Sequence, residues 1–123
     1  MLYETECFEI IGLCMKVHRK LGHGFLESVY KDALEIEFNL AGVPYIREHE
    51  FKIDYFGHFL KTKFYADFTV YESIILEAKA ISGIPDELYA RTINYLKVSN
   101  MNLGLIVNFG KPTLEYKRVI QTK

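Results

Sequence analysis

The sequence predicts a single α/β domain with a mixed central sheet flanked by helices. Apolar residues recur at helical spacing through the first third of the chain, and runs rich in β-branched and aromatic residues fill the middle. A further helical segment is followed by an almost wholly apolar run, which is the arrangement of a βαβ crossover. Of the 123 residues, 50% are hydrophobic, enough for one core of two or three layers, so we expect residues 1–123 to form one domain.

Two helices are expected first. The first extends over Thr5–Leu21 and ends at Gly22, because glycine readily adopts the positive φ of a helix end. The second covers Leu26–Ala41 and ends at Gly42 in the same way. Glu27 then lies in the first turn of the second helix, where the helix macrodipole favours a carboxylate by about 0.3–1 kcal/mol.

The rest of the chain alternates between strands and one more helix. Alternating or continuous apolar runs predict strands at residues 45–47 leading into 50–55, and at 60–70, 74–80, 102–109 and 114–120. Pro85 opens the third helix, because proline is favoured at the first position of a helix. Lys117 and Arg118 mark the last strand as an exposed edge of the sheet.

One predicted hairpin places two acidic residues opposite each other. If residues 71–73 form the loop between its strands, Asp67 lies opposite Glu77. Alternation puts both carboxylates and Lys79 on one face, so only the other, apolar face is expected to join the core. Opposed carboxylates with β-carbons roughly 5 Å apart repel each other unless a cation lies between them. Lys79 supplies one positive charge and a hard divalent ion such as Mg²⁺ the rest; the alternative is a solvated cross-strand ladder.

Six motifs follow one another through the chain. They are Gly24-Phe25-Leu26-Glu27-Ser28-Val29-Tyr30, Ala33-Leu34, Phe64-Tyr65-Ala66-Asp67, Leu76-Glu77-Ala78-Lys79-Ala80, Asn94-Tyr95-Leu96-Lys97 and Leu103-Gly104-Leu105-Ile106-Val107-Asn108-Phe109-Gly110. This set resembles the GxxExxY proteins, a branch of the PD-(D/E)XK phosphodiesterase superfamily. The resemblance implies a restriction-endonuclease-like (PD-(D/E)XK) domain.

The resemblance also implies a role for each residue of the site. Asp67, Glu77 and the backbone carbonyl of Ala78 would bind Mg²⁺ or Mn²⁺, and Glu27 would complete the metal shell. Lys79 would orient or activate the attacking water. These residues are the predicted metal and catalytic set.

The same comparison nominates three substrate contacts and shows two departures. Tyr30, Arg91 and Tyr95 are the candidates for contact with the nucleic-acid backbone, although a buried aromatic such as Tyr30 needs no function. Arg91 stands where relatives often carry glutamine, and its guanidinium can bind phosphate bidentately or pair with a nearby acid. Ala66 stands where the wider superfamily often has proline, and its free N–H suits a strand.

Charge gives the nuclease interpretation little support. The formal net charge is −1, which argues against tight, extended binding of nucleic acid, although a bound cation would neutralise the acidic site locally. The basic clusters at residues 16–23 and 61–63 are interpreted as solvated surface. No stretch is long and apolar enough to cross a membrane and the first residues are acidic, so we expect a cytoplasmic protein without a membrane partner.

The two cysteines allow a further interpretation. Cys7 and Cys14 are separated by about 10.5 Å along one helix, too far for a disulfide. Cys14 and His18 are four residues apart and could form half of a Zn²⁺ site. An ordinary apolar helix stripe explains the same residues and is preferred.

The sequence thus favours a Mg²⁺- or Mn²⁺-dependent phosphodiesterase acting on nucleic acid, with DNA preferred over RNA. The alternative is a non-catalytic module that keeps the nuclease fold to bind nucleic acid or a protein partner. A nuclease of 123 residues must nick one strand or pair with a second copy to cut both, so a homodimer is plausible.

Overall fold

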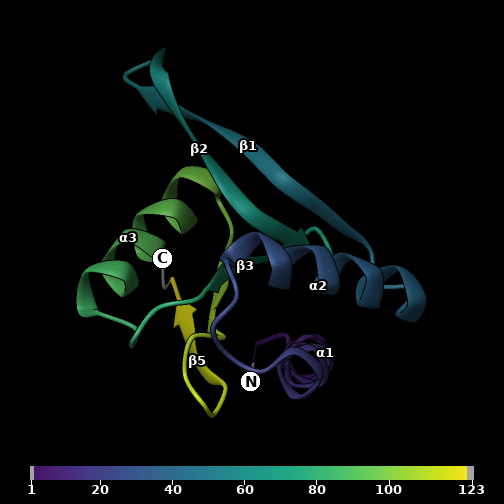
Figure 1. The fold of residues 1–123 in the computed structure, drawn as a ribbon. Coiled ribbons are helices and arrows are strands. Elements are labelled where there is room, and N and C mark those ends of the chain that lie inside the picture. The colour runs from purple at the N-terminus through teal and green to yellow at the C-terminus, as the bar shows by residue number, and fades with distance from the viewer. Residues whose placement is uncertain (1, 122–123) are drawn as a thin grey trace.

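The computed structural model describes residues 2–121 as three helices around one five-stranded sheet (Figure 1). The elements are α1 (Glu4–Leu21), α2 (Glu27–Ala41), β1 (Tyr45–Tyr55), β2 (His58–Val70), β3 (Ile74–Lys79), α3 (Asp86–Ser99), β4 (Leu103–Asn108) and β5 (Glu115–Ile120). The strands lie in the order β1-β2-β3-β4-β5, with β3 and β4 parallel and all other neighbours antiparallel. The predicted α/β class with a mixed sheet is therefore confirmed.

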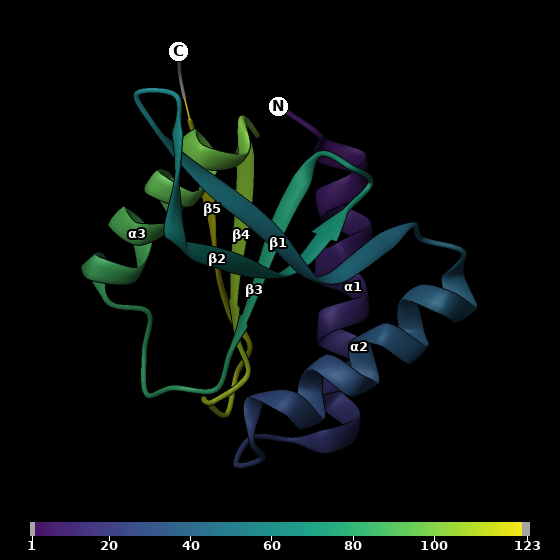
Figure 2. The same cartoon turned by 90° about the horizontal axis from the view of Figure 1, so that it is seen from above.

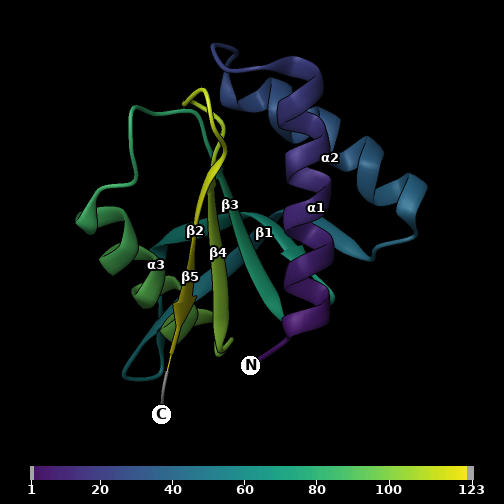
Figure 3. The same cartoon turned by 90° about the horizontal axis from the view of Figure 1, so that it is seen from below.

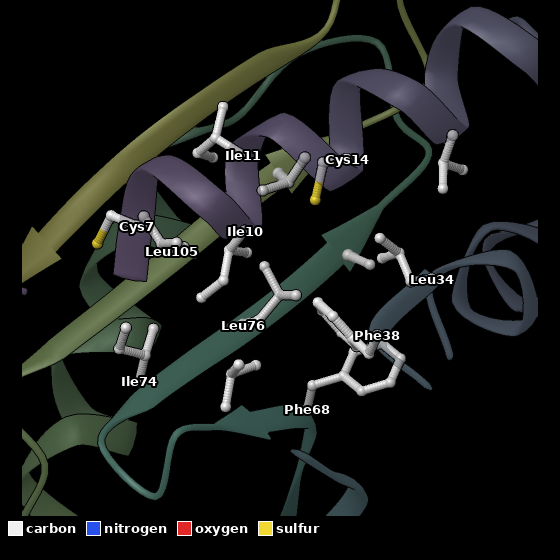
Figure 4. Packing of buried hydrophobic residues seen from close by; sticks show 14 of the residues in the cluster. Cys7, Ile10, Ile11, Cys14, Leu34, Phe38, Phe68, Ile74, Leu76 and Leu105 are labelled. Carbon is white, nitrogen blue, oxygen red and sulfur yellow. The ribbon is translucent and has the colours of Figure 1, made fainter. Parts of the chain in front are cut away.

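The helices cover both faces of the sheet. Helices α1 and α2 lie on one side of it and α3 lies on the other (Figure 3). On the first side, Ile10 of α1 and Phe38 of α2 pack with Leu76 of β3 (Figure 4). Burial of such side chains contributes about 1.5–3 kcal/mol each, which makes this layer the main core.

The second core cluster corrects one expectation from the sequence. Leu88 and Leu96 of α3 pack over Ile75 of β3 and Ile106 of β4, all of them buried. The face of β3 that carries Ile75 and Glu77 is therefore covered, whereas the alternation pattern assigned only the opposite face to the core. The reason is that the β3–α3–β4 crossover lays α3 across that face.

The hairpin between β2 and β3 has the predicted register. Val70 pairs with Ile74 and Phe68 with Leu76, around a loop of residues 71–73. The ladder between these strands ends at Phe68, while β2 goes on pairing with β1 over its whole length. The β1–β2 hairpin consequently leaves the plane of the sheet and projects past α3 (Figures 1 and 2).

This divergence changes the layer that β2 contacts. Phe68 and Val70 pack in the cluster beneath α1 and α2, whereas Phe64 and Ala66 pack in the cluster with α3. The change of layer occurs on either side of Asp67. The fold thus opens one edge of β3 at the position where the sequence predicts the acidic site.

Smaller differences from the predicted elements have local causes. Strand β1 is continuous from Tyr45 to Tyr55 instead of broken, because it pairs with β2 on both sides of Glu48, whose φ is +53°. Both cysteines, Cys7 and Cys14, are free, as their spacing predicted. None of the helices in residues 2–121 is long and apolar enough to cross a bilayer.

Candidate active site

Asp67 and the backbone of Ala78 meet where β2 separates from β3. The N–H of Ala78 donates to Oδ2 of Asp67 at 2.8 Å, so a side chain replaces the main-chain partner that β2 no longer supplies. The N–H and C=O of one strand residue point to the same neighbour. The carbonyl of Ala78 therefore faces the same open edge as Asp67.

Glu77 lies beside Asp67 and is almost completely buried, with 4% of its surface exposed. Within residues 2–121, its Oε1 has no hydrogen-bond partner. Burial raises the pKa of this carboxyl well above its usual value, the charge of Asp67 raises it further, and Lys79 partly offsets both effects. A buried carboxylate oxygen without a partner is costly, and a hard cation is the natural partner for it. The donor set of Asp67, Glu77 and the Ala78 carbonyl therefore fits a divalent ion.

A lysine that the sequence did not nominate joins this pair. The ammonium of Lys31, in the second turn of α2, lies 3.1 Å from Oδ1 of Asp67 and also donates a hydrogen bond to Glu48. Burial alone would lower the pKa of Lys31, but its bonds to Glu48 and Asp67 outweigh that effect and raise it. Both oxygens of Asp67 are therefore engaged, one by Lys31 and one by Ala78.

Glu27 lies farther along the same edge. Its Oε2 accepts a hydrogen bond from the N–H of Ala80 at 3.1 Å, two residues beyond Ala78. No three His, Cys, Asp or Glu side chains of residues 2–121 gather closely enough to hold a metal ion. The structure thus brings Asp67 and Glu77 together and leaves Glu27 as a neighbour, whereas the sequence predicted that all three acids would converge.

A cavity of about 200 Å³ connects Glu27 with Lys79. Arg91 of α3 lines the same cavity, and the remaining lining residues are Ile81, Pro85, Glu87 and Leu88. Tyr95, one helical turn after Arg91, instead stacks on Phe64 of β2, with ring centroids 4.3 Å apart and an angle of 4° between the planes. Of these two predicted substrate contacts, only Arg91 faces the cavity.

Tyr30 has a structural role, because its hydroxyl and its ring both make contacts within the protein. It is fully buried, its hydroxyl donates to the carbonyl of Gly22 at 2.6 Å and accepts from the N–H of Phe25 at 3.3 Å, and its ring stacks on Phe109. Both hydrogen-bonding roles of the hydroxyl are spent within the protein, which corrects its nomination as a substrate contact. Tyr30 fixes the loop that leads into Glu27.

The loop after Lys79 is held by a buried amide that sequence reasoning missed. Oδ1 of Asn108 accepts from the N–H of Ile81 at 2.9 Å, and its Nδ2 donates to the carbonyl of Ile81 and to Glu115. The bond from Asn108, together with those from Ile84 and Lys111, keeps the pKa of Glu115 below its usual value. A polar residue at the end of an otherwise apolar strand was the available signal for this role.

Within the part of the chain that the structure describes, no group of ligands supports a Zn²⁺ site at Cys14 and His18. Nε2 of His18 lies 2.9 Å from the carbonyl oxygen of Lys111, and Cys14 is fully buried, which strongly raises the pKa of its thiol. Cys14 packs in the core beneath α1, as the apolar stripe predicted. His18 is buried as well, whereas the sequence predicted a partly exposed histidine at this end of the stripe.

Comparisons with known proteins bear on the fold and the superfamily of the chain. The family model described as the PD-(D/E)XK nuclease superfamily matches residues 4–119. The crystal structure of SSO0001 has a similar fold, with a TM-score of 0.61 and 20% sequence identity over 98% of this chain. The chain spans 61% of the length of that protein. A comparison with curated proteins found no match.

Proposed function

Because the chain belongs to the PD-(D/E)XK nuclease superfamily, we propose that it is a nuclease that uses Mg²⁺ or Mn²⁺ to hydrolyse the backbone of nucleic acid, DNA in preference to RNA. The motifs from Gly24 to Tyr30 and around Asp67 and Glu77 support a place in the GxxExxY branch. The observation that carries the proposal is the buried, unpartnered Oε1 of Glu77 beside Asp67 and Lys79.

The open edge of β3 supplies the ligands. Asp67, Glu77 and the carbonyl of Ala78 would hold the ion, and Glu27 would complete the shell directly or through water. The bound ion would polarise a phosphoryl oxygen and lower the pKa of a water molecule. Among the described residues, Glu77 is the only acid with a buried side-chain oxygen that lacks a hydrogen-bond partner.

The protein's own cations complete the proposed site. Lys79, half-buried at the end of β3, orients the attacking water and offsets negative charge that develops on the phosphate. Arg91 lines the cavity next to Lys79, where its planar guanidinium can hold a neighbouring phosphate through two parallel hydrogen bonds. Asn108 keeps the loop that carries the cavity wall in place.

The test is cleavage of plasmid and single-stranded DNA with Mg²⁺ or Mn²⁺. We expect Asp67→Ala, Glu77→Ala and Lys79→Ala each to lower the cleavage rate at least about 100-fold, because each removes a charge that acts in the transition state. Lys16→Ala is the matched control, since Lys16 is an exposed lysine on α1 that pairs with Glu37. Undiminished cleavage by all three folded variants would contradict the proposal.

A non-catalytic binding module is the second candidate. It is favoured by Lys31, which already neutralises Asp67, and by the lack of a three-acid cluster within residues 2–121. Calorimetric titration with Mn²⁺ separates the two functions. Binding that Asp67→Asn abolishes supports the nuclease, whereas no binding at millimolar Mn²⁺ supports the module.

The assembly is also a proposal. A protein of this size presents one site and therefore nicks duplex DNA as a monomer, whereas a homodimer could cut both strands. Light scattering of the protein with and without duplex DNA tests whether a second copy is recruited.

A further inference from the structure

The tip of the β1–β2 hairpin is an exposed aromatic surface outside the proposed active site. Tyr55, Phe56 and Phe59 have exposed fractions of 61%, 87% and 68%, and the tip projects away from the helices (Figure 1). Neither core cluster includes these rings. Large apolar groups gathered on a protruding element indicate a binding surface.

The turn itself costs free energy. Phe56 has a φ of +49° and Gly57 a φ of +85°, the conformation in which two-residue hairpin turns normally carry Asn-Gly. A phenylalanine is strained there, and its ring is 87% exposed. The ring meets that of the neighbouring Tyr55 edge-on, with centroids 4.9 Å apart. Within residues 2–121, Phe56 belongs to neither core cluster, so core packing does not offset the strain.

The aromatic tip is flanked by lysines. Lys52 lies directly opposite Lys63 across the two strands, and its ammonium lies 5.4 Å from the ring centre of Phe59. Like charges placed opposite each other destabilise a hairpin, and an anion near them reduces that cost. Lys63 also pairs with Glu50 at 3.3 Å, which leaves Lys52 and Lys61 as the cations nearest the tip.

These side chains form a strip that leads to the candidate active site. Phe59, Lys61, Lys63 and Tyr65 of β2 are all exposed. The register of the two strands shifts between Lys63 and Phe59, but these two residues pair with Lys52 and Asp54, alternate residues of β1, so they lie on one side of the hairpin. Lys63 and Tyr65 share that side by regular alternation. The next residue in this series is Asp67. At about 3.3 Å per residue, the regular part of the strip extends roughly 13 Å from Lys63 to Asp67, and the aromatic tip lies beyond Lys63. We call these residues, together with Tyr55 and Phe56, the hairpin strip.

We propose that the hairpin strip binds single-stranded nucleic acid and guides it toward Asp67. The tip aromatics stack on unpaired bases, and Lys52 and Lys61 contact phosphates. Bases inside a duplex do not expose their faces to such rings, so a single strand fits the strip better. The choice of nucleic acid as partner rests on the proposed function, but the binding itself requires neither metal nor catalysis.

The test is fluorescence anisotropy of a labelled oligothymidine in EDTA, where no cleavage takes place. We expect Phe56→Ser combined with Phe59→Ser to weaken binding at least about tenfold, because two stacking surfaces are lost. Phe8→Ser is the matched control, since Phe8 is 83% exposed on α1, far from the hairpin in sequence, and is not part of the strip. We expect this control to bind like the wild type.

Two further measurements sharpen the result. Lys61→Gln should weaken binding and reduce its salt dependence, because one phosphate contact is removed. A blunt duplex should bind more weakly than the single strand. Circular dichroism confirms that each variant is folded.

The proposal is overturned if the double variant binds like the wild type, or if the duplex binds as tightly as the single strand. It is also overturned if the double variant changes only self-association in light scattering, since the strip would then be a protein interface. Loss of cleavage in Asp67→Asn with intact binding supports the strip on its own. Intact cleavage by that variant would count against the proposed function alone.

Discussion

Glu77 is a carboxylate in an environment that suits a neutral side chain. It is buried, its Oε1 has no partner among the described residues, and the charge of Asp67 lies beside it. These conditions oppose ionisation and therefore make the ionised residue a cost to folding. Such a cost is expected where a site is shaped for a ligand and not for stability.

Glu77→Gln should therefore stabilise the metal-free protein. The pKa of Glu77 is raised in the folded state, so well below pH 4.5, its ordinary pKa, the carboxyl is protonated in both the folded and the unfolded state and the substitution matters little. As the pH rises toward the folded pKa, ionisation favours the unfolded wild type, and the variant gains on the order of 1–3 kcal/mol in free energy of unfolding. Urea unfolding in EDTA at several pH values measures the gain.

The control for this prediction is Glu72→Gln, because Glu72 is an exposed carboxylate in the turn after β2. It should show no comparable gain. A Glu77→Gln variant that is less stable than the wild type at pH 8 would mean that the ionised side chain is satisfied in the fold.

Lys31→Met should tighten metal binding. The ammonium of Lys31 competes with a metal ion for Oδ1 of Asp67, and removing a charge about 3 Å from the ligand atom removes that repulsion. We expect the Kd for Mn²⁺ to fall by roughly tenfold in calorimetry. Lys16→Met, which removes a lysine from the α1 surface, should leave the Kd unchanged. An unchanged or higher Kd for Lys31→Met would show that Lys31 supports the site instead of competing for it.

At the scale of elements, the loop between β3 and α3 is fixed by the end of the neighbouring parallel strand β4, where Asn108 pairs with Lys79. Asn108 binds the N–H and the carbonyl of Ile81, and the N–H of Phe109 donates to the carbonyl of Lys79. Gly110 lies so close to this loop that an added β-carbon would come within 2.3 Å of the Ile81 carbonyl oxygen. The end of β4 and the segment after it therefore fix the position of Ile81, which lines the cavity.

Gly110→Ala should destabilise the protein by about 2–4 kcal/mol, since its methyl group cannot fit without moving backbone. Gly83→Ala is the matched control in the same loop, because a β-carbon there meets nothing within 4 Å. Urea unfolding of both variants measures the difference. Equal stabilities would show that the loop can move away from Gly110 at little cost.

At the scale of the whole molecule, the site exists because the sheet divides. Strand β3 remains paired with β4 in the sandwich of helices, while β2 follows β1 across α3. The edge that β2 abandons keeps its backbone groups, and side chains from β2 and α2 satisfy the N–H groups of Ala78 and Ala80. An ion bound at this edge would connect the hairpin to the body of the sheet.

Metal should therefore stabilise the whole fold. We expect Mn²⁺ to raise the melting temperature of the wild type, since ligand at about 100 times its Kd adds about 2.7 kcal/mol to the free energy of unfolding. Asp67→Asn and Glu77→Gln should lose most of this increase, as measured by thermal unfolding with circular dichroism. The same increase in all three proteins would place the ion elsewhere.

The local architecture follows from the sequence alone. The helices and strands lie within a few residues of their expected bounds, and the short loop at residues 71–73 sets the register that brings Asp67 toward Glu77. Both features depend on interactions between neighbours in the chain, on side-chain periodicity and on loop length. For this reason the fold class and the proximity of Asp67 and Glu77 could be predicted from the sequence.

The surroundings of that pair were decided by tertiary structure. Lys31 reaches Asp67 from 36 positions away, the hydroxyl of Tyr30 turns into the core, and α3 closes over Glu77. The periodicity of apolar residues in the sequence does not predict such contacts, because they depend on how the helices dock and on where β2 leaves the sheet. The sequence by itself determined that Asp67 and Glu77 lie near each other. Only the tertiary structure determined that Glu77 is buried, that Asp67 is paired with Lys31 and that Glu27 lies farther along the edge.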